Sequence, residues 1–134
     1  MAYIGQIPPA DAITASDLAD NLVTSAKLNY AESTLTDRSS IDWNAETQDV
    51  AKVTLAGNRT LNAPSNGTTG QFISLLVIQD GTGSRTLTWN AVYEFASDTA
   101  PTLTTTASKG DVFVFRYNGS KWLEVGRNQA LTLS

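Results

Sequence analysis

The stretch Gln71-Phe-Ile-Ser-Leu-Leu-Val-Ile-Gln79 decides how this chain folds. Its apolar residues fall on both faces of an extended segment rather than on one. A strand that is apolar on both faces belongs in the interior of a sheet. We therefore predict a central strand over residues 71–79, with a β-domain built around it.

Shorter β-like runs lie on both sides of this central strand. Their predicted ranges are 39–43, 50–55, 59–61, 85–89, 92–95, 103–106, 111–117 and 122–125. Turn signals separate them, and Asn118-Gly119 is the strongest hairpin signal because this dipeptide fits tight two-residue turns. The spacing of about ten residues per strand favours a mainly β fold, an antiparallel β-sandwich of jelly-roll-like type.

Composition agrees with this fold class and excludes several functions. The chain of 134 residues has 18 Thr, 12 Ser and 9 Asn, and only 16% of its residues are charged. It contains neither His nor Cys, so the commonest general base and thiolate metal ligands are missing. The net charge of −4 opposes binding to nucleic acid, and the longest apolar run is far shorter than the ~20 residues of a membrane span. We expect no enzyme activity, no cofactor, no metal, no nucleic-acid partner and no membrane insertion.

Residues 1–38 differ from the rest and are predicted to form an extended N-terminal arm, which leaves 39–134 as the β-sandwich domain. Ile13-Thr-Ala-Ser-Asp-Leu-Ala19 and Val23-Thr-Ser-Ala-Lys-Leu-Asn29 repeat at a period of ten residues. Each unit has a Thr that can cap one helical turn, which favours two short turns over a single amphipathic helix from 15 to 28. The arm cannot bury its own large apolar side chains, so we expect it to anchor the protein to a partner through Tyr3, Ile4, Ile7, Ile13, Leu18, Leu22, Val23 and Leu28.

Acidic and glycine-rich segments give weak signals for chemistry. Asp80, Asp98 and Asp111 lie in or beside expected loops, where Asp is usually a turn former. A glycan hydrolase built from two carboxylates is disfavoured, although carboxylates alone can perform that reaction. The glycines of Gly81-Thr-Gly83 precede another strand rather than a helix, which excludes a phosphate loop.

Aromatic residues offer the better candidate site. Trp43, Tyr93 and Trp122 could present ring faces to a glycan, because sugar-binding β-modules use exposed Trp and Tyr in this way. The competing interpretation is that they fill the core, which the alternation around Trp122 favours. Exposure of Trp43, Tyr93 or Trp122 around one groove would indicate binding, and burial of all three Trp residues of the chain would indicate a structural role.

Two segments resemble parts of tailed-bacteriophage virion proteins. One is the ten-residue repeat of the arm, and the other is Val77-Ile-Gln-Asp-Gly-Thr-Gly-Ser-Arg-Thr-Leu-Thr-Trp89 with Ala107–Val112 and Tyr117–Trp122. The resemblance implies a component of the phage particle, in a family of capsid decoration, head fibre and tail-fibre-like proteins. It also implies a homotrimer with an N-terminal anchor and a distal β-domain.

The sequence thus predicts a non-enzymatic virion structural protein. The Met start and the lack of a shaft favour a small capsid decoration or fibre protein, held to a capsid or tail protein by residues 1–38. The alternative is a receptor- or carbohydrate-binding module of a tail fibre or baseplate, with a host surface glycan as partner.

Overall fold

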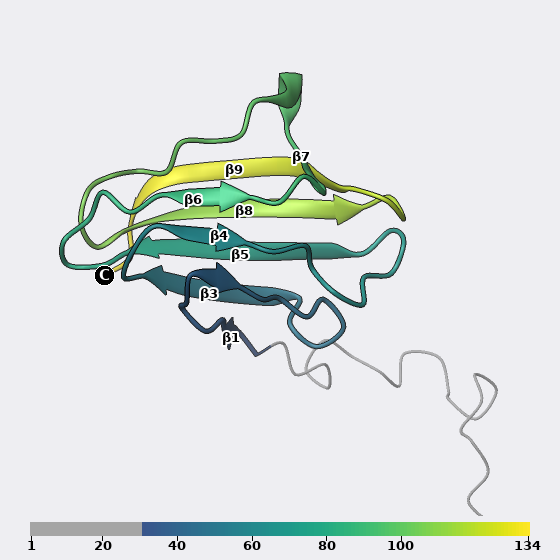
Figure 1. Ribbon diagram of the computed structural model, residues 1–134, viewed down its shortest axis with the longest axis horizontal. Coiled ribbons are helices and arrows are strands. Elements are labelled where there is room, and N and C mark those ends of the chain that lie inside the picture. The colour runs from purple at the N-terminus through teal and green to yellow at the C-terminus, as the bar shows by residue number, and fades with distance from the viewer. Residues whose placement is uncertain (1–30) are drawn as a thin grey trace, which may run out of the picture. The chain divides into compact units, whose positions relative to one another are not determined.

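The computed structural model of the protein describes residues 31–134, which form one β-unit from Ala31 to Ser134 (Figure 1). The strands of this unit are β1 Ser33–Thr34, β2 Ser40–Ile41, β3 Val50–Leu55, β4 Arg59–Leu61, β5 Phe72–Gln79, β6 Leu87–Trp89, β7 Tyr93–Glu94, β8 Lys109–Tyr117 and β9 Trp122–Thr132. A short 3-10 segment, η2, spans Ala96–Asp98. No helix in this part of the chain is long and apolar enough to cross a membrane.

The chain alternates between two sheets from β1 to β6. The six-stranded sheet has the order β1-β3-β5-β8-β9-β7, and the three-stranded sheet has the order β2-β4-β6. All neighbours among β1 to β6 are parallel. Parallel neighbours need a crossover connection, and here each crossover runs through a strand of the other sheet. We call residues 33–89 the coil half.

The remaining strands extend the larger sheet in the antiparallel sense. β8 pairs with β5, and β9 pairs with β8 through the predicted hairpin. The hairpin turn forms at Asn118-Gly119, as expected. Gly119 takes a φ of +95°, and the Asn118 side chain accepts hydrogen bonds from the backbone N–H groups of Ser120 and Lys121. We call residues 109–132 the hairpin half, and Figure 1 shows β8 next to β5 with β9 on the far side of β8.

The mainly β class is confirmed, but an antiparallel jelly-roll-like sandwich is not what forms. The larger sheet is mixed and the smaller sheet is wholly parallel. The spacing of turn signals reports where strands end, and it carries no information on which strands become neighbours. The expected strand at 103–106 is also absent, because the backbone N–H of Thr104 is bound by the Asp111 carboxylate at 2.7 Å instead of by a neighbouring strand.

The core fills the space between the two sheets. Inward positions alternate along each strand, so β5 contributes Ile73, Leu75 and Val77, each at most 2% exposed. The opposite sheet contributes Ile41 and Leu61, which are fully buried. The largest buried side chains are Trp43, Trp122, Phe113 and Phe115.

The first described residues belong to this β-unit. β1 pairs with β3, Leu35 is 3% exposed, and Asp37 forms an ion pair with Arg59 at 2.7 Å. The eight residues predicted to anchor the chain, and the expected helical turns of the arm, lie outside the described residues. The anchoring role therefore stays a prediction.

Candidate functional site

The three aromatic residues predicted to touch a glycan are all buried. Trp43 and Trp122 are 1% exposed and Tyr93 is 5% exposed. The indole N–H of Trp43 donates to the Gln48 carbonyl oxygen at 2.7 Å, and Trp122 stacks on Tyr117 with ring centroids 4.5 Å apart. The indole N–H of Trp43 is therefore already hydrogen-bonded, and one face of the Trp122 ring is already covered by Tyr117. Trp43 and Trp122 therefore act in the core, as their competing interpretation held, and offer no open platform to a sugar.

Tyr93 is buried but lies at the wall of a pocket. Its hydroxyl donates to the Asn62 carbonyl oxygen at 3.0 Å, and burial raises its pKa well above the usual range. The ring is therefore fixed and neutral at physiological pH. Of the three predicted residues, it is the one that reaches a candidate site.

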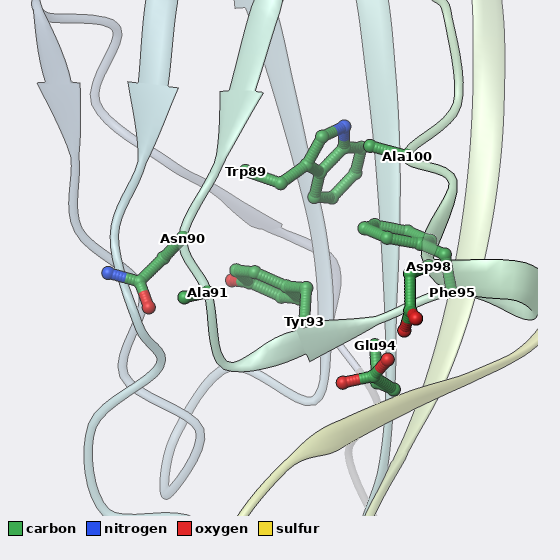
Figure 2. A pocket seen from close by; sticks show the side chains of 8 residues that line it. All are labelled: Trp89, Asn90, Ala91, Tyr93, Glu94, Phe95, Asp98 and Ala100. Atoms are coloured by element: carbon green, nitrogen blue, oxygen red, sulfur yellow. The ribbon is translucent and has the colours of Figure 1, made fainter.

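This pocket has a volume of about 200 Å³ and lies around β7 and η2. Figure 2 shows its lining, which consists of Trp89, Asn90, Ala91, Tyr93, Glu94, Phe95, Asp98 and Ala100. We call it the aromatic pocket. All eight residues come from one continuous segment of twelve positions, 89–100, because the chain turns back on itself after β6 and again at η2.

The aromatic wall of the pocket is rigid. Trp89 packs edge-on against Tyr93 and Phe95, with ring centroids 5.4 and 5.3 Å away, and against Phe113 of the core at 5.0 Å. Such edge-to-face pairs stabilise by about 0.5–1.5 kcal/mol each beyond their buried area. Trp89 is itself only half-buried, so its ring faces both the core and the pocket. The wall is thus held in place before any ligand arrives.

Polar groups surround this wall. Glu94 forms an ion pair with Lys121 at 3.5 Å, and Asp98 is exposed on η2. The indole Nε1–H of Trp89 is buried and has no hydrogen-bond partner among the described residues. The Asn90 side chain accepts a hydrogen bond from the Val92 N–H at 3.0 Å, so it shapes the turn rather than the opening. The carboxylates of Glu94 and Asp98 can therefore accept hydrogen bonds at the opening of the pocket.

The η2 segment forms an exposed and strained rim. Ser97 and Asp98 take φ values of +56° and +53°, in the left-handed region that non-glycine residues avoid. Each such residue costs on the order of 1–3 kcal/mol and is held only where the surrounding structure requires it. Figure 1 shows this segment at the tip of a loop that projects beyond the edge of the larger sheet. The rim of the pocket is thus its most outward part.

The acidic residues singled out in the sequence do not assemble into a catalytic or metal centre. Asp80 is a turn former that accepts hydrogen bonds from the N–H groups of Thr82 and Gly83, and its bond from Arg85 does most to lower its pKa to about 2. Asp111 is 2% exposed and binds backbone groups. Among residues 31–134 there is no group of three or more side chains that could hold a metal ion.

A second cavity of about 210 Å³ lies between residues 85–87 and 101–105. It is lined by Thr, Pro, Leu and one Arg, and it contains no aromatic ring. Small-ligand sites are usually lined by apolar and aromatic side chains, with a few polar groups that fix the ligand's orientation. The aromatic pocket is therefore the stronger candidate.

Sequence reasoning missed Trp89, Glu94, Phe95 and Asp98 as members of one site. A usable signal was present, because Trp89-Asn-Ala-Val-Tyr-Glu-Phe95 holds three aromatic residues within seven positions. Three aromatic residues this close together on one segment could have indicated a cluster of rings beyond what a single strand contributes to the core.

A comparison with models of known protein families identifies the class of the chain. A family model described as "Putative phage tail fibre C-terminal domain" matches residues 40–122. The chain belongs to this family. The match spans β2 to the start of β9 and includes the whole aromatic pocket. The resemblance to phage virion proteins is thereby confirmed, and the protein is a structural component of the fibre class. No curated protein matches the chain.

Proposed function

We propose that this protein is a tail-fibre domain that binds a surface carbohydrate of the host in the aromatic pocket. The observation that carries the proposal is a preformed aromatic wall with carboxyl groups at its rim, within the segment matched by a tail-fibre family. Tail fibre replaces capsid decoration as the leading assignment because the matching family is one of tail fibres.

The chemistry of the pocket favours a neutral sugar. Aromatic rings pack against the C–H face of a pyranose, and carboxylates accept hydrogen bonds from its hydroxyl groups. Glu94 and Asp98 lie in a protein of net charge −4, so an anionic sugar would be repelled. The volume of about 200 Å³ is below the ~300–1,000 Å³ of sites for drug-sized ligands, which suits a single sugar unit.

Attachment and assembly complete the proposal. The segment that holds the eight apolar anchor residues, Tyr3 to Leu28, attaches the protein to another virion protein, and the chain acts without catalysis as a homotrimer. The apolar residues of the arm and its resemblance to virion anchors support the first part. A trimer would present three equivalent pockets, and several weak sites on one particle bind a repetitive polysaccharide far more tightly than one site does.

The test is binding of neutral mono- and oligosaccharides to the full chain, measured by saturation-transfer NMR and calorimetry. We expect Glu94→Gln and Asp98→Asn each to weaken binding about tenfold, because each loses a charge-assisted hydrogen bond of about 1.5 kcal/mol. Glu46→Gln is the matched control, since Glu46 is exposed and lies outside the pocket. Absence of binding across neutral sugars, or equal weakening by the control, would overturn the proposal.

A further inference from the structure

The second cavity adjoins the aromatic pocket along the chain. Its lining comes from 85–87 and 101–105, whereas that of the aromatic pocket comes from 89–100. One wall of each cavity is β6 or a residue beside it, and the other wall includes part of residues 95–105, which we call the return segment. On β6 only Thr88 separates the two linings. The cavities therefore follow one another between the same two stretches of chain.

The free edge of β6 runs along both cavities. β6 is the last strand of the smaller sheet, so only one of its edges is paired. The carbonyl oxygen of Thr86 and the N–H of Asn90 are hydrogen-bonded to residues of β4. Successive residues of a strand direct their peptide groups to opposite edges, so those of Leu87 and Trp89 point away from β4. No backbone hydrogen bond joins either residue to the return segment.

The second cavity also carries polar side chains that the fold leaves available. Thr86, Thr102 and Thr105 line it and are exposed, and their hydroxyl groups form no hydrogen bond with another described residue. Arg85 donates to the Asp80 carboxylate through Nε and Nη2, at 3.1 and 2.8 Å. Because this ion pair balances its charge, the cavity offers hydrogen bonds without a net attraction for anions.

The base and the size of the second cavity suit one sugar unit. Leu87 and Leu103 line it and are at most 8% exposed, so they give it an apolar base. Its volume, about 210 Å³, is close to the volume of the aromatic pocket, about 200 Å³. Together the two cavities reach the ~300–1,000 Å³ that is typical of sites for larger ligands.

The spacing of the two cavities suits linked sugars. Leu87 lines one cavity and Trp89 lines the other, and two residues of an extended strand span about 6.6 Å. This distance is comparable with the length of one sugar unit in a polysaccharide. A ligand that fills the aromatic pocket can therefore continue into the second cavity along the free edge of β6.

We propose that the two cavities are consecutive subsites for an oligosaccharide of at least two neutral sugar units. This inference rests on the proposed function and deepens it, because it makes the ligand a chain of linked sugars. One unit packs on the aromatic wall. The next unit lies over the apolar base of the second cavity, where threonine hydroxyls and the free peptide groups of β6 bind its hydroxyl groups.

The experiment compares sugars of one and two units on the full chain by calorimetry. The panel is glucose, galactose, mannose and N-acetylglucosamine, with the disaccharides in which each is linked to itself. For the sugar that binds, we expect the disaccharide to bind about tenfold more tightly, because its second unit adds one or two hydrogen bonds.

A substitution in the second cavity should remove this gain. Thr102→Arg fills the cavity from an exposed position, so the disaccharide and the monosaccharide should bind equally tightly to this variant. Thr47→Arg is the matched control, because Thr47 is also an exposed threonine outside the regular strands and lines neither cavity. This control should keep the tenfold gain.

The outcomes separate this inference from the proposed function. A disaccharide that binds no more tightly than the monosaccharide, or a gain that persists in Thr102→Arg, would overturn the second subsite and leave a single-sugar site in the aromatic pocket. Absence of binding by every sugar would overturn the proposed function, and this inference with it.

A measurement on the wild type decides the matter if Thr102→Arg does not fold. The backbone amide signals of Leu87 and Trp89 in ¹H–¹⁵N spectra report on the two cavities separately. The monosaccharide should shift the Trp89 signal and leave the Leu87 signal in place, whereas the disaccharide should shift both. A bound disaccharide that leaves the Leu87 signal unmoved would contradict the second subsite.

Discussion

The coil half and the hairpin half of the β-unit reach the same core by different means. In the coil half, parallel strands of two to eight residues alternate between the sheets, and each is positioned by a long crossover. In the hairpin half, two strands of nine and eleven residues run antiparallel through one tight turn. Local pairing suffices for the hairpin, whereas the coil requires contacts between distant residues at every turn.

Each half also relies on one buried polar side chain. In the coil half, the Gln79 amide donates to the carbonyl oxygen of Arg85 at 2.9 Å and accepts from its N–H at 2.8 Å. In the hairpin half, the Asp111 carboxylate accepts from the N–H groups of Thr104 and Ala130 at 2.7 and 2.9 Å. Both side chains hydrogen-bond to backbone groups that are not paired with a neighbouring strand. The comparison teaches that irregular connections in this fold are fixed from within the core.

The largest expected effect tests whether the two halves unfold together. Phe113→Ala in the hairpin half should lower the free energy of unfolding by about 3–5 kcal/mol, and Leu61→Ala in the coil half by about 2–5 kcal/mol. Both residues are fully buried in one shared cluster. Urea unfolding followed by Trp fluorescence and by far-UV circular dichroism should give one coincident transition for each variant. Separate transitions would show that the halves are independent.

The next effect compares the two buried polar groups. Asp111→Ala leaves two backbone N–H groups without their acceptor and should cost at least about 2 kcal/mol, since each unpaired buried donor costs about 1–3 kcal/mol. Gln79→Leu should cost a similar amount in the coil half. Thermal unfolding of the two variants gives the comparison, with Asp42→Ala as an exposed control within about 0.5 kcal/mol of the wild type. If Asp111→Ala left the free energy of unfolding unchanged, the backbone hydrogen bonds between β8 and β9 alone would be enough to hold the hairpin half.

A smaller effect concerns the point where the coil half touches the segment before β8. Gly83 has a φ of +76°, and a Cβ there would lie 2.5 Å from the Thr105 carbonyl oxygen. Gly83→Ala should therefore destabilise by about 1–3 kcal/mol. Gly81→Ala is the matched control, because no atom lies within 4 Å of its added Cβ. Equal unfolding midpoints for the two variants would contradict this close approach.

The smallest effect depends on pH and is confined to the coil half. The hydrogen bond from Arg59 lowers the pKa of Asp37 below its usual value of 3.8. Stability from this pair is therefore present above that value and is lost as pH falls through the lowered pKa. Asp37→Asn should cost at most about 1 kcal/mol at pH 7, because both partners are partly exposed. The unfolding midpoints of the wild type and of Asp37→Asn should differ at pH 7 and should converge as the pH falls through the lowered pKa of Asp37. A difference that stays constant with pH would show that the Asp37–Arg59 pair does not contribute in this way.

The sequence predicted the elements whose causes are local. The central strand at 71–79 forms as β5 and is paired on both sides, because its apolar residues favour burial on either face. The Asn118-Gly119 hairpin forms because its turn conformation depends on those residues alone. The parallel pairing of β3 with β5 could not be predicted, because residue 50 meets residue 74 only after an intervening strand.

The candidate site was predictable only in part. Tyr93 was named as one of three possible glycan contacts, and the other two are core residues. The aromatic pocket depends on where the chain turns after Trp89 and on the left-handed backbone at Ser97 and Asp98. Ser and Asp do not demand that backbone, so the sequence contains no sign of it.

The projecting tip at 96–100 has a consequence for how the protein can change. All five side chains there are small and exposed, and none belongs to the core. Substitutions at such positions usually alter stability by less than about 0.5 kcal/mol. Variation can therefore accumulate at the tip without endangering the fold, while the rings beneath it stay constant. For the proposed glycan-binding role, this tip is where the rim of the pocket can change with the least cost to the fold.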